Sequence, residues 1–260
     1  MTKQPGSRHP IAKPPLVLTM LEPLRFGLGV STLFAASGLL AAAPRGDSHP
    51  VMVLPGFATS DAMTGLLRSF LLQLGYRVYP WELGWNFDQH SAGANGEHIA
   101  RRIAQIAADC GEDVSLVGWS LGGVLAREAA RRDRGGIRQV IALGSPFTGN
   151  PEATSLSLLY DLLTGNKTRS EASSRRYAVG HHPIDVPATA VYSHSDGITA
   201  WENCCGLEGP QTENIAVVVS HFCFVASPAV FWAVADRLAQ PAGEWRPFER
   251  GGPFAAFFEA

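Results

Sequence analysis

The motif Gly118-Trp119-Ser120-Leu121-Gly122 constrains the fold of this chain more than any other stretch. It follows an apolar run at residues 114–117 and precedes a helical pattern at residues 121–132. Between a strand and a helix, G-x-S-x-G predicts a nucleophile elbow, a sharp turn that holds the serine in strained backbone geometry and needs small residues around it. The turn also places the hydroxyl at the positive end of a helix dipole, which favours developing anions. A glycine-rich turn without chemistry is the alternative that the motif alone leaves open.

The rest of the chain alternates apolar runs with helical patterns. Strands are predicted at residues 51–54, 76–79, 114–117, 139–143, 188–192 and 215–219, and helices at 61–74, 121–132 and 228–239, with a further helix around a buried stripe at Ile99, Ile103 and Ile106. Such alternation predicts an α/β fold with a mostly parallel sheet and helices on both faces. In these sheets the ligand lies beyond the carboxyl ends of the strands, where Ser120 is expected.

The domain organisation follows from where this alternation stops. Residues 145–187 interrupt it, which predicts a small cap or lid inserted into one core made of residues 44–144 and 188–245. Residues 246–260 are expected to form a C-terminal tail. A chain of 260 residues with 46% apolar content is large enough to bury one sizeable core.

The N-terminal stretch has three interpretations. Residues 1–15 are polar, basic and proline-containing, which predicts a disordered tail. Residues 16–43 are mostly apolar and are expected to form a helix that is docked on the body, anchored in a membrane or cleaved as a signal peptide. Glu22, Pro23 and Arg25 interrupt the apolar run, which favours the docked helix. A cytoplasmic or membrane-associated location is accordingly favoured over secretion.

Composition excludes several classes of function. A formal net charge of −2 provides no electrostatic basis for binding nucleic acid. The four cysteines show neither C-x-x-C nor zinc-ligand spacing, so no metal site is expected. Adjacent Cys204 and Cys205 fit a disulfide and free thiols equally well, which leaves the redox compartment open.

A serine nucleophile needs a base and a group that orients the base. In a sheet of this kind these groups follow in the order Ser, Asp or Glu, and His, each at a strand exit. His221 leaves the predicted strand at 215–219, and Asp196 leaves the strand before it. Asp196 is predicted to hold the imidazole in its useful tautomer. Gly197 is expected to permit the turn that aims the carboxylate.

The oxyanion formed on attack needs two backbone donors. The amide of Leu121, directly after Ser120, is one candidate. The amide of Phe57, in the loop Leu54-Pro55-Gly56-Phe57 after the first strand, is the other. Four more residues are weaker candidates for substrate contacts, with ordinary packing as the alternative: Trp85, Asn86, Trp119 and Phe222.

Residues 54–57, 118–122, 195–197 and 220–221 together resemble the α/β-hydrolase superfamily, and within it bacterial esterase- and lipase-like proteins with a Leu-Pro-Gly-Phe oxyanion loop. The resemblance covers roughly residues 50–240. It implies Ser120, Asp196 and His221 as a catalytic triad, and ester hydrolysis through an acyl-enzyme. Bulky Phe222 stands where many lipase-like members have a small or aliphatic residue, which predicts a narrowed acyl pocket.

These observations predict a serine carboxylesterase that acts on short- to medium-chain esters without a metal or organic cofactor. A lipase or acyltransferase attached to a membrane through residues 16–43 is one alternative. A hydrolase-fold binding protein without turnover is another, although a binder has no need of all three triad residues. Specificity depends on how the cap packs, so the acyl and alcohol groups do not follow from the sequence, and neither does the oligomeric state.

Overall fold

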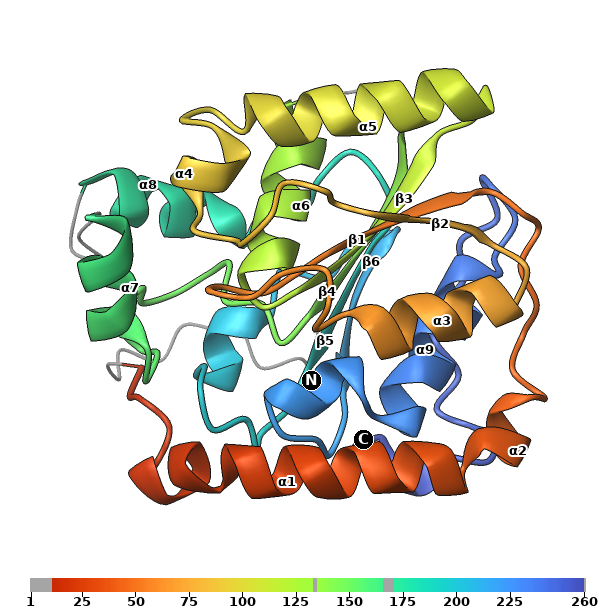
Figure 1. Ribbon diagram of the computed structural model, residues 1–260, viewed down its shortest axis with the longest axis horizontal. Coiled ribbons are helices and arrows are strands. Elements are labelled where there is room, and N and C mark those ends of the chain that lie inside the picture. The colour runs from red at the N-terminus through yellow and green to blue at the C-terminus, as the bar shows by residue number, and fades with distance from the viewer. Residues whose placement is uncertain (1–10, 133–134, 166–170, 260) are drawn as a thin grey trace.

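A single sheet of six strands forms the centre of the computed structural model, which describes residues 11–132, 135–165 and 171–259 (Figure 1). Its strands are β1 (Pro50–Leu54), β2 (Arg77–Pro80), β3 (Val114–Trp119), β4 (Ile137–Leu143), β5 (Ala188–Tyr192) and β6 (Thr212–Ala216). Their order across the sheet is β2-β1-β3-β4-β5-β6, and every neighbouring pair is parallel. The predicted parallel α/β sheet is confirmed.

Helices cover both faces of this sheet (Figure 1). They are α1 (Leu16–Ala35), α2 (Ser37–Leu40), α3 (Gly65–Gln73), α4 (Gln89–Ala92), α5 (Glu97–Cys110), α6 (Leu121–Arg132), α7 (Ser157–Thr164), α8 (Glu171–Gly180) and α9 (Pro228–Leu238), with 3₁₀ turns η1 (Trp201–Cys204), η2 (Phe222–Val225) and η3 (Ala255–Phe257). Successive strand side chains point to opposite faces. Met52 and Leu54 accordingly join the core under α5 and α6, whereas Val51 and Val53 join the core under α3 and α9.

Strand β6 differs from its prediction. It spans Thr212–Ala216 and pairs with β5, so it begins three residues before the predicted range of 215–219 and ends three residues earlier. Its first residues are polar, and hydrophobic patterning therefore missed them. An edge strand tolerates polar side chains because only one of its sides is covered by a neighbouring strand.

The segment predicted as a cap connects β4 to β5 and contains α7 and α8. Both helices lie at one side of the molecule, near the start of α6 (Figure 1). Residues 166–170 of this segment lie outside the described residues. The cap therefore borders the end of the sheet at which Ser120 lies.

Both ends of the described chain pack on the body. The apolar stretch 16–43 forms α1 and α2, and α1 lies against η2, the turn directly after His221. Residues 1–10 of the predicted disordered tail lie outside the described residues. At the other end, the predicted tail is anchored, because Phe248, Phe254 and Phe258 are buried in the core beside α9.

Candidate active site

Ser120 lies between the end of β3 and the start of α6, in the strained turn that the motif predicts. Its φ of 53° falls in the left-handed region, which side-chain-bearing residues rarely adopt. A Cβ at Gly118 would lie 2.4 Å from the carbonyl carbon of Gly122, and a Cβ at Gly122 would lie 2.4 Å from the carbonyl oxygen of Leu54. Both glycines are therefore required for the turn to fit beneath the neighbouring loop.

The structure brings His221 and Asp196 to this serine. His221 Nε2 lies 3.0 Å from Ser120 Oγ, and His221 Nδ1 lies 2.7 Å from Asp196 Oδ2. The imidazole is buried, with 2% of the residue exposed. Trp119 packs beside the ring, and its indole N–H donates to the carbonyl oxygen of His221 at 3.0 Å. With the proton on Nδ1, Nε2 is free to accept the serine proton.

The Asp196 carboxylate is buried and accepts four hydrogen bonds. Oδ1 accepts the backbone amides of Ile198 at 2.7 Å and Thr199 at 2.8 Å. Oδ2 accepts the Thr199 hydroxyl at 2.9 Å in addition to His221 Nδ1. Hydrogen bonds to a charged acceptor are among the stronger ones in proteins. They hold the carboxylate in one orientation with one oxygen directed at the imidazole.

Gly197 has a different role from the predicted one. Its φ does not lie in the left-handed region, so the turn does not depend on glycine. A Cβ at this position would lie 2.6 Å from the carbonyl oxygen of Leu18 and 2.8 Å from Glu22 Oε1, both on α1. The glycine is needed because the N-terminal helix packs directly on the Asp196 loop.

Glu22 on α1 is a site residue that the sequence analysis missed. Its side chain is fully buried. Oε1 accepts the amides of Gly197 and His221, each at 2.9 Å, and Oε2 accepts the amide of Phe222 at 3.1 Å. The one signal in the sequence was a charged residue that interrupts an apolar run. These three donors lie 175 to 200 residues further along the chain.

The two amides predicted to form an oxyanion hole flank Ser120. Leu121 follows it directly, and Phe57 lines the same cavity. Within the described part of the chain, neither amide donates a hydrogen bond. Gly56 allows the loop to approach, because a Cβ there would lie 3.2 Å from Ser120 Cβ and 2.9 Å from the Trp119 ring.

Asn86 holds the loop that carries the Phe57 amide. It is fully buried and does not line the cavity, so the structure places it behind the loop and out of reach of a substrate. Its side chain donates to the carbonyl oxygen of Pro55 at 2.7 Å. The backbone of Asn86 also bonds to this loop. Its backbone carbonyl oxygen accepts the amide of Ala58, and its backbone N–H donates to the carbonyl oxygen of Thr59, both at 2.8 Å.

The other three candidates for substrate contacts also lie outside the cavity lining. Trp85 is 60% exposed and stacks on Phe87. Trp119 is buried behind the elbow, and Phe222 packs edge-on against it and against Phe26 of α1. Phe222 therefore supports the histidine loop and does not narrow the described cavity.

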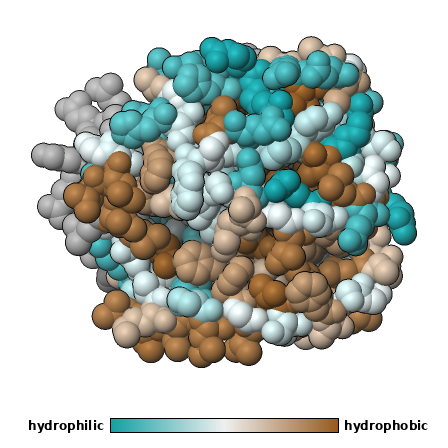
Figure 2. Space-filling view, viewed as in Figure 1, coloured by the Kyte–Doolittle hydropathy of each residue, from teal (hydrophilic) through white to brown (hydrophobic). Residues whose placement is uncertain are grey.

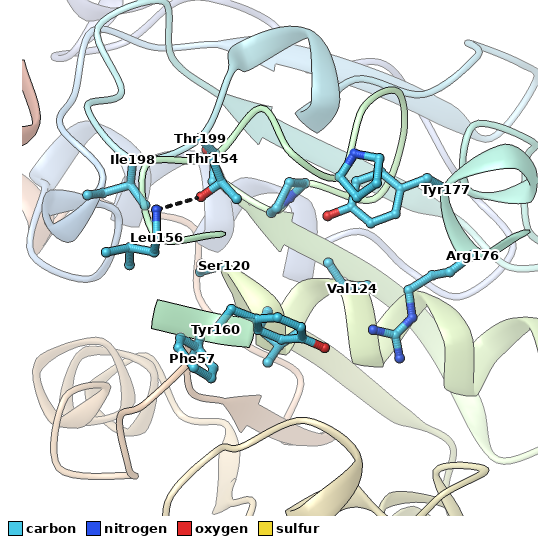
Figure 3. A pocket seen from close by; sticks show the side chains of 13 residues that line it. Phe57, Ser120, Val124, Thr154, Leu156, Tyr160, Arg176, Tyr177, Ile198 and Thr199 are labelled. Atoms are coloured by element: carbon cyan, nitrogen blue, oxygen red, sulfur yellow. Dashed lines mark hydrogen bonds between the residues drawn. The ribbon is translucent and has the colours of Figure 1, made fainter. Parts of the chain in front are cut away.

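A cavity of about 80 Å³ opens beside Ser120 (Figure 3). Its lining comes from the elbow, the oxyanion loop, the Asp196 loop and the cap: Phe57, Ser120, Leu121, Val124, Pro146, Pro151, Thr154, Leu156, Tyr160, Arg176, Tyr177, Ile198 and Thr199. Most of these side chains are apolar. The arrangement therefore offers a nucleophile, a base and two unpaired amides beside a mainly apolar space.

Comparisons with known proteins agree with this geometry at the level of fold. Neither models of protein families nor curated protein sequences match the chain. Among solved structures, an Aspergillus fumigatus lipase B superposes with a TM-score of 0.58 at 21% identity, over 78% of this chain and 56% of that one. A mature Bacillus licheniformis lipase superposes with a TM-score of 0.56 at 17% identity, over 76% and 94%. A Paleococcus ferrophilus monoacylglycerol lipase has a TM-score of 0.52 at 18% identity, over 76% and 96%.

The chain has the α/β-hydrolase fold. Its strand order, its elbow after β3 and its cap after β4 place the site at the carboxyl edge of the sheet. The chain spans 56% of the Aspergillus lipase, so that protein contains much that has no counterpart here.

In this hydrolase fold, one buried ionic network ties the cap to the core. Asp88 accepts hydrogen bonds from Arg176 of α8, at 3.0 and 3.3 Å, and from the hydroxyl of Tyr160 of α7. Arg176 also pairs with Glu128 of α6. Burial raises the pKa of Tyr160, so its phenol stays protonated and donates. The network was not predicted, because a single aspartate in a loop has no distinguishing pattern.

The four cysteines of this chain are free thiols. Burial raises the pKa of Cys204 well above its ordinary value and that of Cys205 to about 12, so both stay protonated at neutral pH. The described residues contain no group of histidine, cysteine and acidic side chains that suits a metal ion.

Proposed function

We propose that this protein is a carboxylic ester hydrolase with Ser120 as its nucleophile. The observation that carries the proposal is the hydrogen-bonded series Ser120–His221–Asp196, with distances of 3.0 and 2.7 Å, beside a mainly apolar cavity. The structural neighbours reported above are lipases by name, which supports the same chemistry.

The geometry supports a two-step acyl transfer. His221 Nε2 takes the proton from Ser120 Oγ as the oxygen attacks the ester carbonyl. The amides of Phe57 and Leu121 stabilise the resulting oxyanion, and each such donor contributes about 3–4 kcal/mol. His221 then returns the proton to the leaving alcohol, which leaves an acyl group on Ser120. His221 then takes a proton from a water molecule as the water oxygen attacks the acyl carbon. The bond to Ser120 Oγ breaks, His221 returns the proton to Oγ, and the carboxylic acid leaves.

The size of the cavity supports short- to medium-chain acyl groups. A single buried water needs about 10–15 Å³ on this scale, so the cavity of about 80 Å³ has room for about five to eight such positions. Acyl chains with a similar number of carbon atoms fill the cavity without moving the cap. The ionic network around Asp88 and Arg176 opposes such a movement.

Hydrolysis of p-nitrophenyl esters from acetate to palmitate tests the proposal. The wild-type protein is expected to hydrolyse esters with acyl chains from butyrate to octanoate in length, and Ser120→Ala is expected to lose on the order of 10⁴-fold or more in kcat. Ser69→Ala, at an exposed position on α3, is the matched control and should retain full activity. Equal inactivity of all three proteins on every ester contradicts the proposal and favours a binding protein. Equal activity means that another serine is the nucleophile.

A second candidate function, ester hydrolysis at a membrane surface, is favoured by the outer face of α1. This helix is long and apolar enough by length and composition to cross a membrane. Large apolar side chains are exposed along its length, from Leu16 at 72% and Met20 at 73% to Phe34 at 66%. The exposed hydroxyls of Ser31 and Thr32 donate to carbonyl oxygens of the helix itself. Its two charged residues, Glu22 and Arg25, bond inward to the body. Figure 2 shows the resulting apolar band along the lower edge, where α1 lies in Figure 1.

We infer that this face rests on a lipid bilayer with the helix parallel to the surface. The helix cannot span the bilayer without giving up the inward bonds of Glu22 and Arg25. Residues 1–15 carry Lys3, Arg8 and Lys13 and no acidic residue, which suits anionic lipid. Cosedimentation with vesicles containing anionic phospholipid tests the inference. Met20→Glu combined with Leu24→Glu should abolish binding, whereas Leu72→Glu, at a similarly exposed site on α3, should not. Equal binding by both variants contradicts it.

A further inference from the structure

The inner face of α1 contacts both loops that carry the triad partners of Ser120. Arg25 donates to the carbonyl oxygen and hydroxyl of Ser195, at 2.8 and 3.1 Å, directly before Asp196. Glu22 accepts the amide of Gly197, directly after Asp196, and the amide of His221 itself. One turn of helix therefore holds the loop of the carboxylate and the loop of the base.

The helix approaches these loops closely enough to require small residues on both sides. A Cβ at Gly197 would collide with the backbone of α1, as described above. A Cβ at Gly29 would lie 2.5 Å from Cys223 Sγ. Cys223 in turn donates to the carbonyl oxygen of Arg25 at 3.1 Å. The helix is therefore packed directly on the residues that follow His221 as well as on the Asp196 loop.

The Glu22 carboxylate matches this environment in a way that other side chains do not. A buried anion is unfavourable unless hydrogen bonds and charges compensate for the lost water. Three amides converge on Glu22, and Arg25 Nη1 lies 3.8 Å from Oε1. A glutamine offers only one acceptor oxygen, and its NH₂ group would face at least one of the amide donors. An aspartate keeps the charge but is one methylene too short to serve both loops.

We propose that Glu22 is a positioning residue of the active site, which holds His221 and the Asp196 loop in register through their backbone amides. The proposal rests on the proposed function, because it assigns these two residues as base and orienter. It makes α1 part of the catalytic machinery, so the active protein retains residues 16–35. Removal of the stretch as a signal peptide would leave the amides of Gly197, His221 and Phe222 without their acceptor.

Steady-state hydrolysis of p-nitrophenyl butyrate by three α1 variants tests the proposal. A displacement of about 1 Å at catalytic groups can lower the rate about 10²-fold. Glu22→Gln is expected to lower kcat by about 10²-fold with KM changed less than about threefold. Glu22→Asp keeps the charge and serves as the second variant if Glu22→Gln fails to fold. It is expected to lower kcat by about tenfold. Leu33→Ala is the matched control, since it shortens a buried apolar side chain further along the same helix, beside Phe70 and Phe231. Its kcat should stay within about twofold of wild type.

The outcomes separate positioning from stability. Wild-type kcat in folded Glu22→Gln or Glu22→Asp overturns the proposal. A loss of kcat in Leu33→Ala as large as in the glutamate variants, at equal loss of thermal stability, also overturns it, because helix docking alone then explains the effect.

A spectroscopic readout distinguishes failure of this proposal from failure of the proposed function. The His221 Nδ1 proton in its 2.7 Å bond to Asp196 should give a downfield proton NMR signal whether or not the protein hydrolyses esters. Glu22→Gln should shift or broaden this signal, and Leu33→Ala should leave it unchanged. An unchanged signal in Glu22→Gln overturns the positioning role even if no ester is hydrolysed.

Discussion

The fixed orientation of the Asp196 carboxylate makes Asp196→Asn a sharp test of the catalytic assignment. Oδ1 accepts two backbone amides, from Ile198 and Thr199, whereas Oδ2 faces His221 Nδ1. Only an oxygen satisfies two amide donors at once. The introduced carboxamide should therefore place its oxygen at the Oδ1 position and its NH₂ group against the imidazole.

This orientation has a consequence for the base. The NH₂ group donates to His221 Nδ1, so the ring proton moves to Nε2. That nitrogen, 3.0 Å from Ser120 Oγ, can then no longer accept the serine proton. A wrong tautomer of this kind costs about 10⁴-fold in kcat, equivalent to about 5.5 kcal/mol of transition-state stabilisation. The backbone bonds to Oδ1 persist, so the fold should change little.

Hydrolysis of p-nitrophenyl butyrate, with thermal unfolding measured in parallel, checks this expectation. Thr199→Val is the control, because it removes the hydroxyl donor to Oδ2 and keeps the carboxylate. Its kcat should fall by less than about tenfold. If Asp196→Asn retains more than a tenth of the wild-type kcat, either the orientation or the role of Asp196 is wrong.

Three further predictions concern the oxyanion loop, the cap and acid stability. Asn86→Ala removes the side chain that holds the oxyanion loop, so kcat on the same ester is expected to fall about 10²-fold with little change in KM; full activity would show that the loop holds its shape unaided. Asp88→Asn weakens the tie to the cap, which should lower the melting temperature and raise activity on decanoate relative to butyrate, and an unchanged chain-length profile would contradict this. Burial lowers the pKa of His49 in the folded protein. As the pH falls below about 6.5, the unfolded chain therefore protonates this histidine before the folded protein does, and the free energy of unfolding should decrease. Although burial alone raises the pKa of Asp47, hydrogen bonds from His49 help to lower it to about 2, which adds a loss between about pH 4 and 2. Urea unfolding at pH 7, 5 and 3 measures the losses assigned to His49 and to Asp47. The assignment to His49 is refuted if a His49→Gln variant loses as much stability as wild type between pH 7 and 5.

Local sequence patterns determined the sheet and the turn that presents Ser120. Glycine positions around a strained serine and apolar periodicity act over a few neighbouring residues, so they can be read directly along the chain. Chain order and strand exits were sufficient to select His221 and Asp196, which the structure brings within hydrogen-bond distance of one another. The prediction was less good for β6, whose polar first residues lie at the sheet edge.

Only the tertiary structure revealed what holds these groups in place. Glu22, Asn86 and Asp88 are buried polar residues whose partners lie far away in the chain. Such contacts have no periodicity, and each residue taken alone resembles an ordinary polar residue at a helix or loop position. Their importance arises from burial, because a desolvated carboxylate or amide must find particular hydrogen-bond partners. Which partners become available is decided when distant segments pack together.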